Sequence, residues 1–64
     1  MTYVLHILTH GRRYKEDYGS LEEAIAAALA LEHEPRERAE QITVDGKVVV
    51  DRDALDVLAR DQRQ

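Results

Sequence analysis

Alternating and helical patterns of apolar residues divide this chain into six segments. Residues 3–9 and 13–18 alternate in polarity, as half-buried strands do. Residues 20–34 repeat apolar positions at helical spacing, and residues 51–60 do so over a shorter length. Two β-rich runs, residues 41–44 and 47–50, lie between these helices. The predicted order of elements is therefore β-β-α-β-β-α.

This order predicts an α+β domain, in which a mainly antiparallel sheet of three or four strands packs against one long helix. We expect a single domain over residues 1–64, with a first hairpin (1–19), a central helix (20–34), a second hairpin (40–50) and a short C-terminal helix (51–60). The charged residues 34–40 are interpreted as a solvated connector with room for one helical turn.

The central helix carries the clearest local signals. Ser20 and Glu23 match a capping box, in which the Ser20 hydroxyl accepts a hydrogen bond from the Glu23 backbone N–H. Pro35 disfavours helical geometry at the residue before it, so the helix is expected to end near His33. Its apolar side is expected to pack on the sheet, and consists of Leu21, Ala24, Ile25, Ala28 and Leu31, with Leu29 at the margin.

The dipeptide Asp45-Gly46 predicts that the second hairpin closes with a type I′ turn. Both central residues of such a turn have positive φ, which aspartate and glycine tolerate. The two-residue loop then predicts four cross-strand pairs: Val44 with Lys47, Thr43 with Val48, Ile42 with Val49, and Gln41 with Val50. In this register the side chains that face the helix are Ile42, Val44 and Val49.

Aliphatic side chains remain on the opposite face of the predicted sheet. Alternation in the first strand directs Val4 and Leu8 away from the helix. The C-terminal helix, capped by Asp51 or Asp53, offers a further apolar stripe made of Ala54, Leu55, Val57 and Leu58. It can pack on its own sheet or on a partner. We therefore expect a protein interface, formed with a second copy or with another protein, that contains Val4, Leu8, Val48, Val50, Leu55 and Leu58.

Composition narrows the possible classes of function. The 64 residues carry a formal charge of −4, which argues against a general binder of nucleic acids or anionic membranes. No apolar run approaches the roughly 20 residues needed to span a bilayer. The opening Met1-Thr2-Tyr3-Val4 lacks the basic start of a secretory signal, so we expect a cytoplasmic protein. Its layout is that of many short bacterial and phage α+β proteins.

No catalytic, metal or cofactor signature is visible in the sequence. There is no cysteine, and Ser20 is already assigned to the helix cap. His6 and His10 share a strand face but lie roughly 13 Å apart, whereas the ligand atoms of one zinc ion lie within about 4 Å of one another. We expect a non-enzymatic protein with no catalytic residue, bound metal or cofactor.

The tip of the first hairpin suggests an alternative function. Arg12, Arg13, Tyr14 and Lys15 place three cations beside an aromatic ring, a composition typical of contacts with single-stranded nucleic acid. The competing interpretation is a solvated turn on an acidic protein, in which nearby carboxylates neutralise these cations. Nucleic-acid contact through these four residues is kept as the alternative.

Two stretches in the first half of the chain have counterparts in a known family. Tyr3-Val4-Leu5 opens a strand, and Ser20-Leu21-Glu22-Glu23-Ala24-Ile25 opens a helix after a second strand. This arrangement distantly resembles the partial-RNase-H antitoxins of the HicB type, and the resemblance implies an antitoxin-like regulatory protein. The small-residue-rich segment that those antitoxins carry before the helix has no counterpart, and no DNA-binding appendage is recognisable.

Overall fold

The computed structural model describes residues 1–62 and contains a four-stranded antiparallel sheet with two helices. In chain order the elements are β1 (Tyr3–Thr9), β2 (Arg12–Tyr18), α1 (Leu21–Ala30), the 3-10 helix η1 (Leu31–His33), β3 (Glu37–Val44), β4 (Lys47–Val50) and α2 (Arg52–Gln62). The strand order is β2-β1-β3-β4, and every neighbouring pair is antiparallel. The predicted α+β class and order of elements are confirmed.

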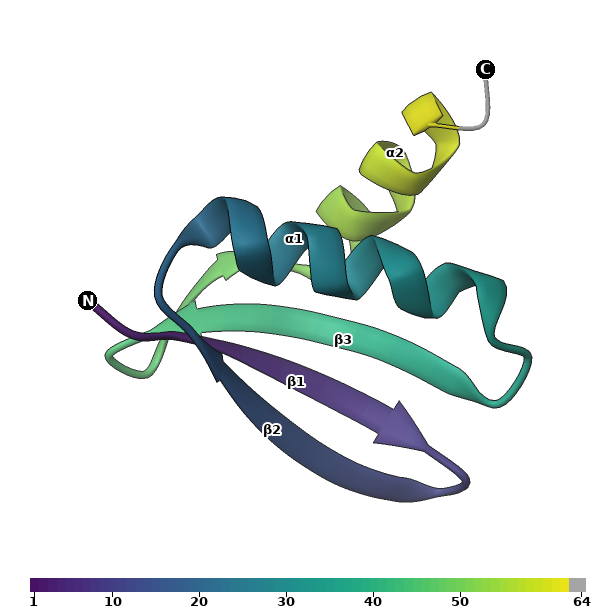
Figure 1. Cartoon of the computed structure of the whole chain (residues 1–64), viewed down its shortest axis with the longest axis horizontal. Coiled ribbons are helices and arrows are strands. Elements are labelled where there is room, and N and C mark those ends of the chain that lie inside the picture. The colour runs from purple at the N-terminus through teal and green to yellow at the C-terminus, as the bar shows by residue number, and fades with distance from the viewer. Residues whose placement is uncertain (63–64) are drawn as a thin grey trace.

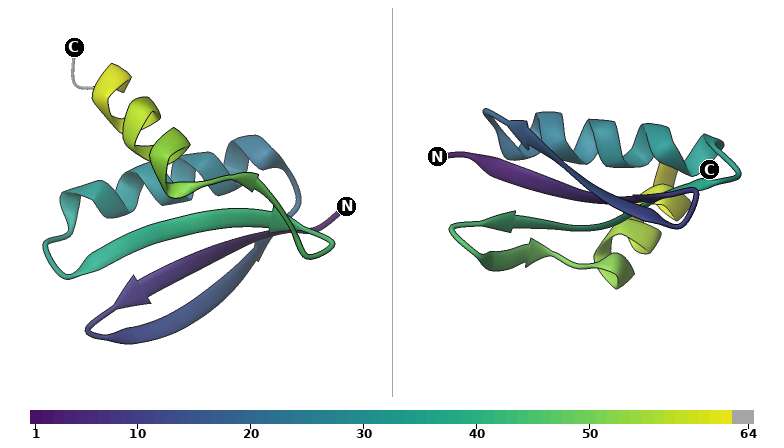
Figure 2. Two further views of the ribbon diagram at one scale, coloured as in Figure 1. Left: turned by 180° about the vertical axis from the view of Figure 1, so that it is seen from behind. Right: turned by 90° about the horizontal axis from the view of Figure 1, so that it is seen from below.

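The two helices lie in different places relative to the sheet. Helix α1 packs along one face, and α2 follows β4, contacts α1 and points away from it at an angle (Figure 1). Seen from the side opposite α1, no helix lies over strands β1, β2 and β3, and α2 lies off to one side of them (Figure 2, left). One face of the sheet is therefore covered by a helix and the other is left open.

The hydrophobic core lies between α1 and the two central strands. Leu5 of β1 and Ile42 of β3 are fully buried, and Ala24 and Ala28 of α1 pack against them. Because alanine side chains are short, the helix backbone lies close to the sheet. The apolar side predicted for this helix faces the core, which confirms the amphipathic pattern.

Local signals define the two ends of α1 as predicted. The Glu23 backbone N–H donates to Ser20 Oγ at 3.2 Å, so Ser20 is the N-cap. At the other end the chain tightens into η1, and the Glu34 N–H donates to the Leu31 carbonyl at 3.0 Å. The helical segment thus ends at His33, before Pro35.

Strand β3 begins earlier than the sequence predicts. The solvated connector predicted over residues 34–40 is wrong from Glu37 onward, because Thr9, Leu8 and Ile7 of β1 pair with Glu37, Arg38 and Ala39. Ala39 is only 1% exposed. The charged neighbours of Ala39 concealed this strand, since only alternate positions of a strand face the core.

A β-bulge corrects the predicted register of the second hairpin. Asp45 and Gly46 have φ of 52° and 79°, as a type I′ turn requires. The pairs next to the turn are confirmed, but Ile42 pairs with Val50 instead of Val49. One extra residue in a strand reverses the faces of those that follow. Val50 is consequently buried in the core at 8% exposure, whereas Val49 is 49% exposed.

Helix α2 packs on its own chain through a narrower stripe than predicted. Asp51 is its N-cap, because Asp51 Oδ1 accepts from the Ala54 N–H at 2.8 Å. Leu55 lies in the core at 1% exposure. The predicted stripe is wrong at Ala54 and Val57, both exposed, because α2 meets the core mainly through Leu55 and Ala59, one turn apart.

Replacing Val50 with alanine is expected to lower the free energy of unfolding by about 1–3 kcal/mol, because buried methyl groups are lost and a cavity is left. The matched change Val49→Ala is expected to alter it by less than about 0.5 kcal/mol, since this side chain is half exposed. Urea unfolding followed by circular dichroism measures both. Equal losses for the two variants would contradict the bulged register.

Candidate interaction surface

The sheet face opposite α1, called here the open face, carries the outward side chains of all the strands. The cross-strand register arranges them in rows. One row holds Asp17, Val4, Thr43 and Val48, the next holds Lys15, His6 and Gln41, and the third holds Arg13, Leu8 and Arg38. The open face therefore passes from aliphatic side chains at one end of the strands to cationic ones at the other.

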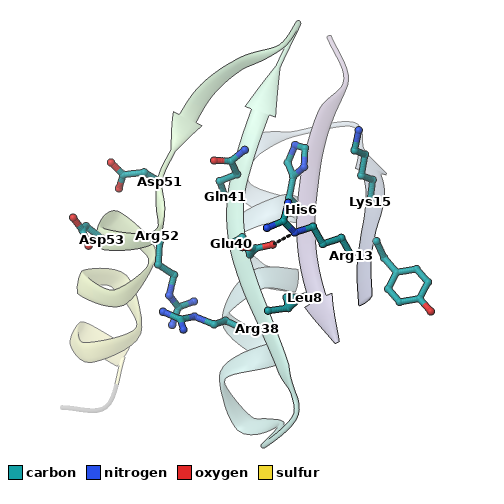
Figure 3. Close-up of a pocket in the computed structure, with 11 residues that line it drawn as sticks. His6, Leu8, Arg13, Lys15, Arg38, Glu40, Gln41, Asp51, Arg52 and Asp53 are labelled. Atoms are coloured by element: carbon teal, nitrogen blue, oxygen red, sulfur yellow. Dashed lines mark ion pairs between the residues drawn. The ribbon is translucent and has the colours of Figure 1, made fainter. Parts of the chain in front are cut away.

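The cationic end of the open face forms a shallow groove of about 850 Å³. Its floor includes His6, Leu8 and Gln41 of the two central strands (Figure 3). Strand β2 borders it on one side with Arg13 and Lys15, and the start of α2 borders it on the other (Figure 3). Elements from both halves of the chain thus build this groove together.

Positive charges outnumber negative ones on the side of the groove formed by β2 and β3, where Glu40 is the one carboxylate among the lining residues. Arg13 Nε is 3.7 Å from Glu40 Oε1, the one ion pair that Figure 3 draws. Within residues 1–62, neither Lys15 nor Arg38 has a carboxylate oxygen within 4.0 Å. The acidic side is formed by Asp51 and Asp53 at the start of α2. The side made by β2 and β3 is therefore the one suited to an anionic group.

His6 and Thr43 on the open face are joined by a side-chain hydrogen bond. The Nε2 atom of His6 lies 2.9 Å from Thr43 Oγ1. Thr43 is only 7% exposed, so its hydroxyl is not presented to the groove as a nucleophile would be. His10 lies in the turn after β1, with Nδ1 3.1 Å from Thr9 Oγ1. In the described part of the chain, no three His, Asp or Glu side chains converge as ligands for one metal ion.

Arg52 fixes the side of the groove that α2 provides. Its Nη1 donates to the Ala39 carbonyl at 2.6 Å and to Glu32 Oε1 at 3.2 Å. Its Nη2 lies 2.7 Å from Asp56 Oδ1 on the next turn of α2. One guanidinium thus ties α2 to β3 and to η1. The sequence offers no signal for this role, because the partners become neighbours only in the folded chain.

The interface residues predicted from the sequence lie in different parts of the structure, some on the open face and others in the core. Val4, Leu8 and Val48 share the open face, where Val48 is 50% exposed. Val50 and Leu55 were predicted at the interface, but both are buried in the core and are unavailable to a partner. Leu58 is half-buried on α2. The aliphatic part of the open face is therefore smaller than predicted.

The basic residues of the hairpin tip do not form one surface. Arg13 and Lys15 lie on the open face, whereas Arg12 and Tyr14 pair with the helix-facing residues Thr9 and Ile7. Alternation along β2 separates them, because neighbouring side chains of a strand point to opposite faces. Arg38 joins Arg13 and Lys15 on the open face. The sequence interpretation missed Arg38, because it placed this residue in a connector.

Another groove, of about 290 Å³, lies between α1 and the helix-facing side chains of β2, β1 and the start of β3. Tyr18 and Glu16 border it, and the Tyr18 hydroxyl donates to Glu16 Oε2 at 2.6 Å. This hydrogen bond, together with partial burial and the negative charge of Glu16, raises the pKa of Tyr18 from 10.0 to about 12. The hydrogen bond thus joins Glu16 and Tyr18, two residues apart on β2.

These features describe a small α+β domain with one open sheet face and a charged edge strand. Comparisons of the chain with protein-family models, with curated proteins and with solved structures give no match. Over the described residues 1–62, neither helix has the length and apolar character needed to cross a membrane. The function is therefore argued from the surfaces of this chain alone.

Replacing Arg52 with alanine is expected to lower the free energy of unfolding by about 1–3 kcal/mol, because the Ala39 carbonyl loses a charged donor. Amide hydrogen exchange should also become faster in α2 more than in β1, since the contacts of Arg52 hold α2 in place. Arg60→Ala on the same helix is the matched control, because Arg60 is exposed. Unchanged exchange in α2 of the Arg52 variant would contradict the assigned role.

Tyr18 is expected to lose its proton near pH 12, as measured by ultraviolet absorbance of the protein minus that of the Tyr18→Phe variant. The folded-state pKa lies above the unfolded value of 10.0, so this group stabilises the fold below pH 10. That contribution is lost as the pH rises through about 12. The Glu16→Gln substitution should lower the pH at which half of the Tyr18 hydroxyls have lost their proton. A midpoint near 10 in the unaltered protein would contradict the hydrogen bond.

Proposed function

We propose that this chain is a small non-enzymatic protein-interaction domain that binds a partner segment on its open sheet face. The supporting observation is that α2, which has the length to cover that face, packs at the side of the sheet against α1. Val4, Leu8 and Val48 thus remain at least partly accessible. Apolar surface kept accessible beside charged groups is typical of binding sites.

The chemistry of the open face indicates the kind of segment that it binds. Leu8 offers an apolar contact on the floor of the groove, between Arg13 on β2 and Arg38 on β3. Lys15 adds a further positive charge one row away. A partner segment that carries apolar side chains together with aspartate or glutamate matches this arrangement. Such pairing supplies both burial and charge complementarity.

A display library of random peptides of about twelve residues, a length suited to a groove of this kind, tests the proposal. The selected peptides are expected to be rich in acidic and aliphatic residues. Their binding should weaken at least about tenfold in Arg38→Glu, through charge reversal, and in Val48→Asp, through loss of apolar contact. Fluorescence anisotropy measures the affinities, and amide chemical shifts locate the contact on the protein.

Arg12→Glu is the matched control, because it reverses another exposed arginine, which lies on the helix side of the same sheet. It should leave peptide affinity within about twofold, apart from the general effect of net charge. Circular dichroism verifies that each variant is folded. If no peptide is enriched, or if the shifts map away from the open face, the proposal is wrong.

Nucleic-acid binding is the second candidate function, favoured by the grouping of Arg13, Lys15 and Arg38 on one face. Labelled single-stranded and duplex oligonucleotides of about 20 nucleotides, at about 50 mM salt, distinguish it from the first. Binding to phosphates should fall steeply with salt and should be lost in Arg38→Glu but not in Val48→Asp. Peptide binding should weaken in both variants.

A further inference from the structure

The outer edge of β2 is a second surface with its own chemistry. This strand is seven residues long and lies at the end of the sheet, so one side of its backbone has no partner strand in the described chain. Its side chains are charged or aromatic throughout, and all except Tyr18 are exposed. Natural edge strands carry charges that discourage pairing with arbitrary strands. The order of these charges decides which strand can still pair.

The hairpin turn establishes which backbone groups of β2 face the free edge. His10 and Gly11 have φ of 50° and 78°, as in a type I′ turn, and Thr9 pairs with Arg12, so the Arg12 N–H is expected to donate to the Thr9 carbonyl. On the opposite side of β1, the His10 N–H donates to the Arg36 carbonyl, which agrees with this alternation. Every second residue along β2, starting at Arg12, then forms backbone hydrogen bonds with β1. The residues that offer N–H and C=O groups to the free edge are Arg13, Lys15 and Asp17.

The charges along β2 are segregated by sign. Arg12 and Arg13 open the strand, and Glu16 and Asp17 close it. Two copies of such a strand, running antiparallel, bring the basic half of each against the acidic half of the other. We propose that a second copy of this chain pairs with the β2 edge in antiparallel orientation, so that two four-stranded sheets join across a two-fold axis.

The charges and the strand length select one register, centred on Lys15. In this register Arg13 lies opposite the partner's Asp17, and both side chains are on the open face. On the helix side, Arg12 lies opposite the partner's Tyr18. Its guanidinium therefore approaches the hydrogen-bonded pair formed by the partner's Tyr18 and the partner's Glu16. All the outward-facing backbone groups of both strands are paired.

Neighbouring registers are less favourable. The two-fold axis is perpendicular to the sheet, so a pairing can shift only by two residues if each side chain is to stay on its own face. Such a shift moves the centre of the pairing by one residue, to Tyr14 or to Glu16. Centring the pair on Tyr14 sets Arg13 against the partner's Lys15, so like charges meet. Centring it on Glu16 sets Lys15 against the partner's Asp17, but it also sets Glu16 against itself and leaves Arg12 and Arg13 beyond the partner strand, so the strong cations have no partner. The register centred on Lys15 has one like-charge contact, between the two lysines themselves.

This pairing deepens the proposed function without depending on it. The perpendicular two-fold axis places both open faces on the same side of the joined sheet. A dimer therefore presents two peptide-binding grooves on one continuous surface, which permits bivalent binding. Arg13 and Lys15 belong to both surfaces, but Arg38 and Val48, which test the open face, lie on β3 and β4 and away from the dimer edge. Failure of one proposal is thus distinguishable from failure of the other.

Light-scattering chromatography of the full chain, from about 5 to about 500 µM and at low salt, measures the dimer directly. The mass is expected to rise from monomer toward dimer with concentration. Arg13→Glu and Asp17→Arg should each weaken the dimer by roughly 10-fold to 100-fold, since each replaces two attractive cross-strand pairs with repulsive ones. The double variant Arg13→Glu/Asp17→Arg should restore dimerisation to near the original affinity.

Two further variants serve as controls. Arg38→Glu changes the net charge by as much as Arg13→Glu but lies away from the β2 edge, so it should leave the dimer unchanged. Lys15→Gln removes the like-charge contact at the centre and should tighten the dimer. The proposal is overturned by a monomer at every concentration, by a dimer that ignores the Arg13 and Asp17 variants, or by failure of the double variant to rescue. Circular dichroism confirms that each variant is folded.

Discussion

The packing of α1 against the central strands is the contact on which the rest of this structure depends. Leu5 and Ile42 are fully buried beneath Ala24 and Ala28, and the other core residues surround this contact. A chain of 64 residues buries a limited apolar surface, and here it does so on one side of one sheet. The face opposite α1 is therefore left without a helix, and its side chains are free to serve recognition instead of folding.

The short strand β4 determines where the C-terminal helix lies. Only the Ile42–Val44 part of β3 pairs with β4, so the earlier part of β3 has no strand on that side. Helix α2 lies next to this gap, with Leu55 in the core and Arg52 bonded to the Ala39 carbonyl. A charged donor satisfies a carbonyl that a strand would otherwise have bonded. This arrangement completes the core and still leaves the open face accessible.

Both of the proposed recognition surfaces depend on the same alternation along β2. Its odd-numbered residues, such as Arg13 and Lys15, contribute cations to the open face, and the strand also forms the free edge of the sheet. The open face offers apolar and cationic side chains to a partner segment. The edge offers backbone hydrogen bonds whose flanking charges match a second copy. The net charge of −4 does not reveal either surface, because it does not show how the cations and carboxylates are grouped in the fold.

The sequence by itself determined the features that depend on neighbouring residues. Ser20 and Glu23 specified the start of α1, Asp45-Gly46 specified the second turn, and helical spacing identified Ala24 and Ala28 as core residues. The tertiary structure alone decided that β3 starts at Glu37, that a bulge buries Val50 instead of Val49, and that Arg38 joins the cations of β2. Each of these depends on a partner strand distant in the chain. Local propensity and periodicity do not report such partners, because cross-strand pairing is fixed by the packing of the whole sheet.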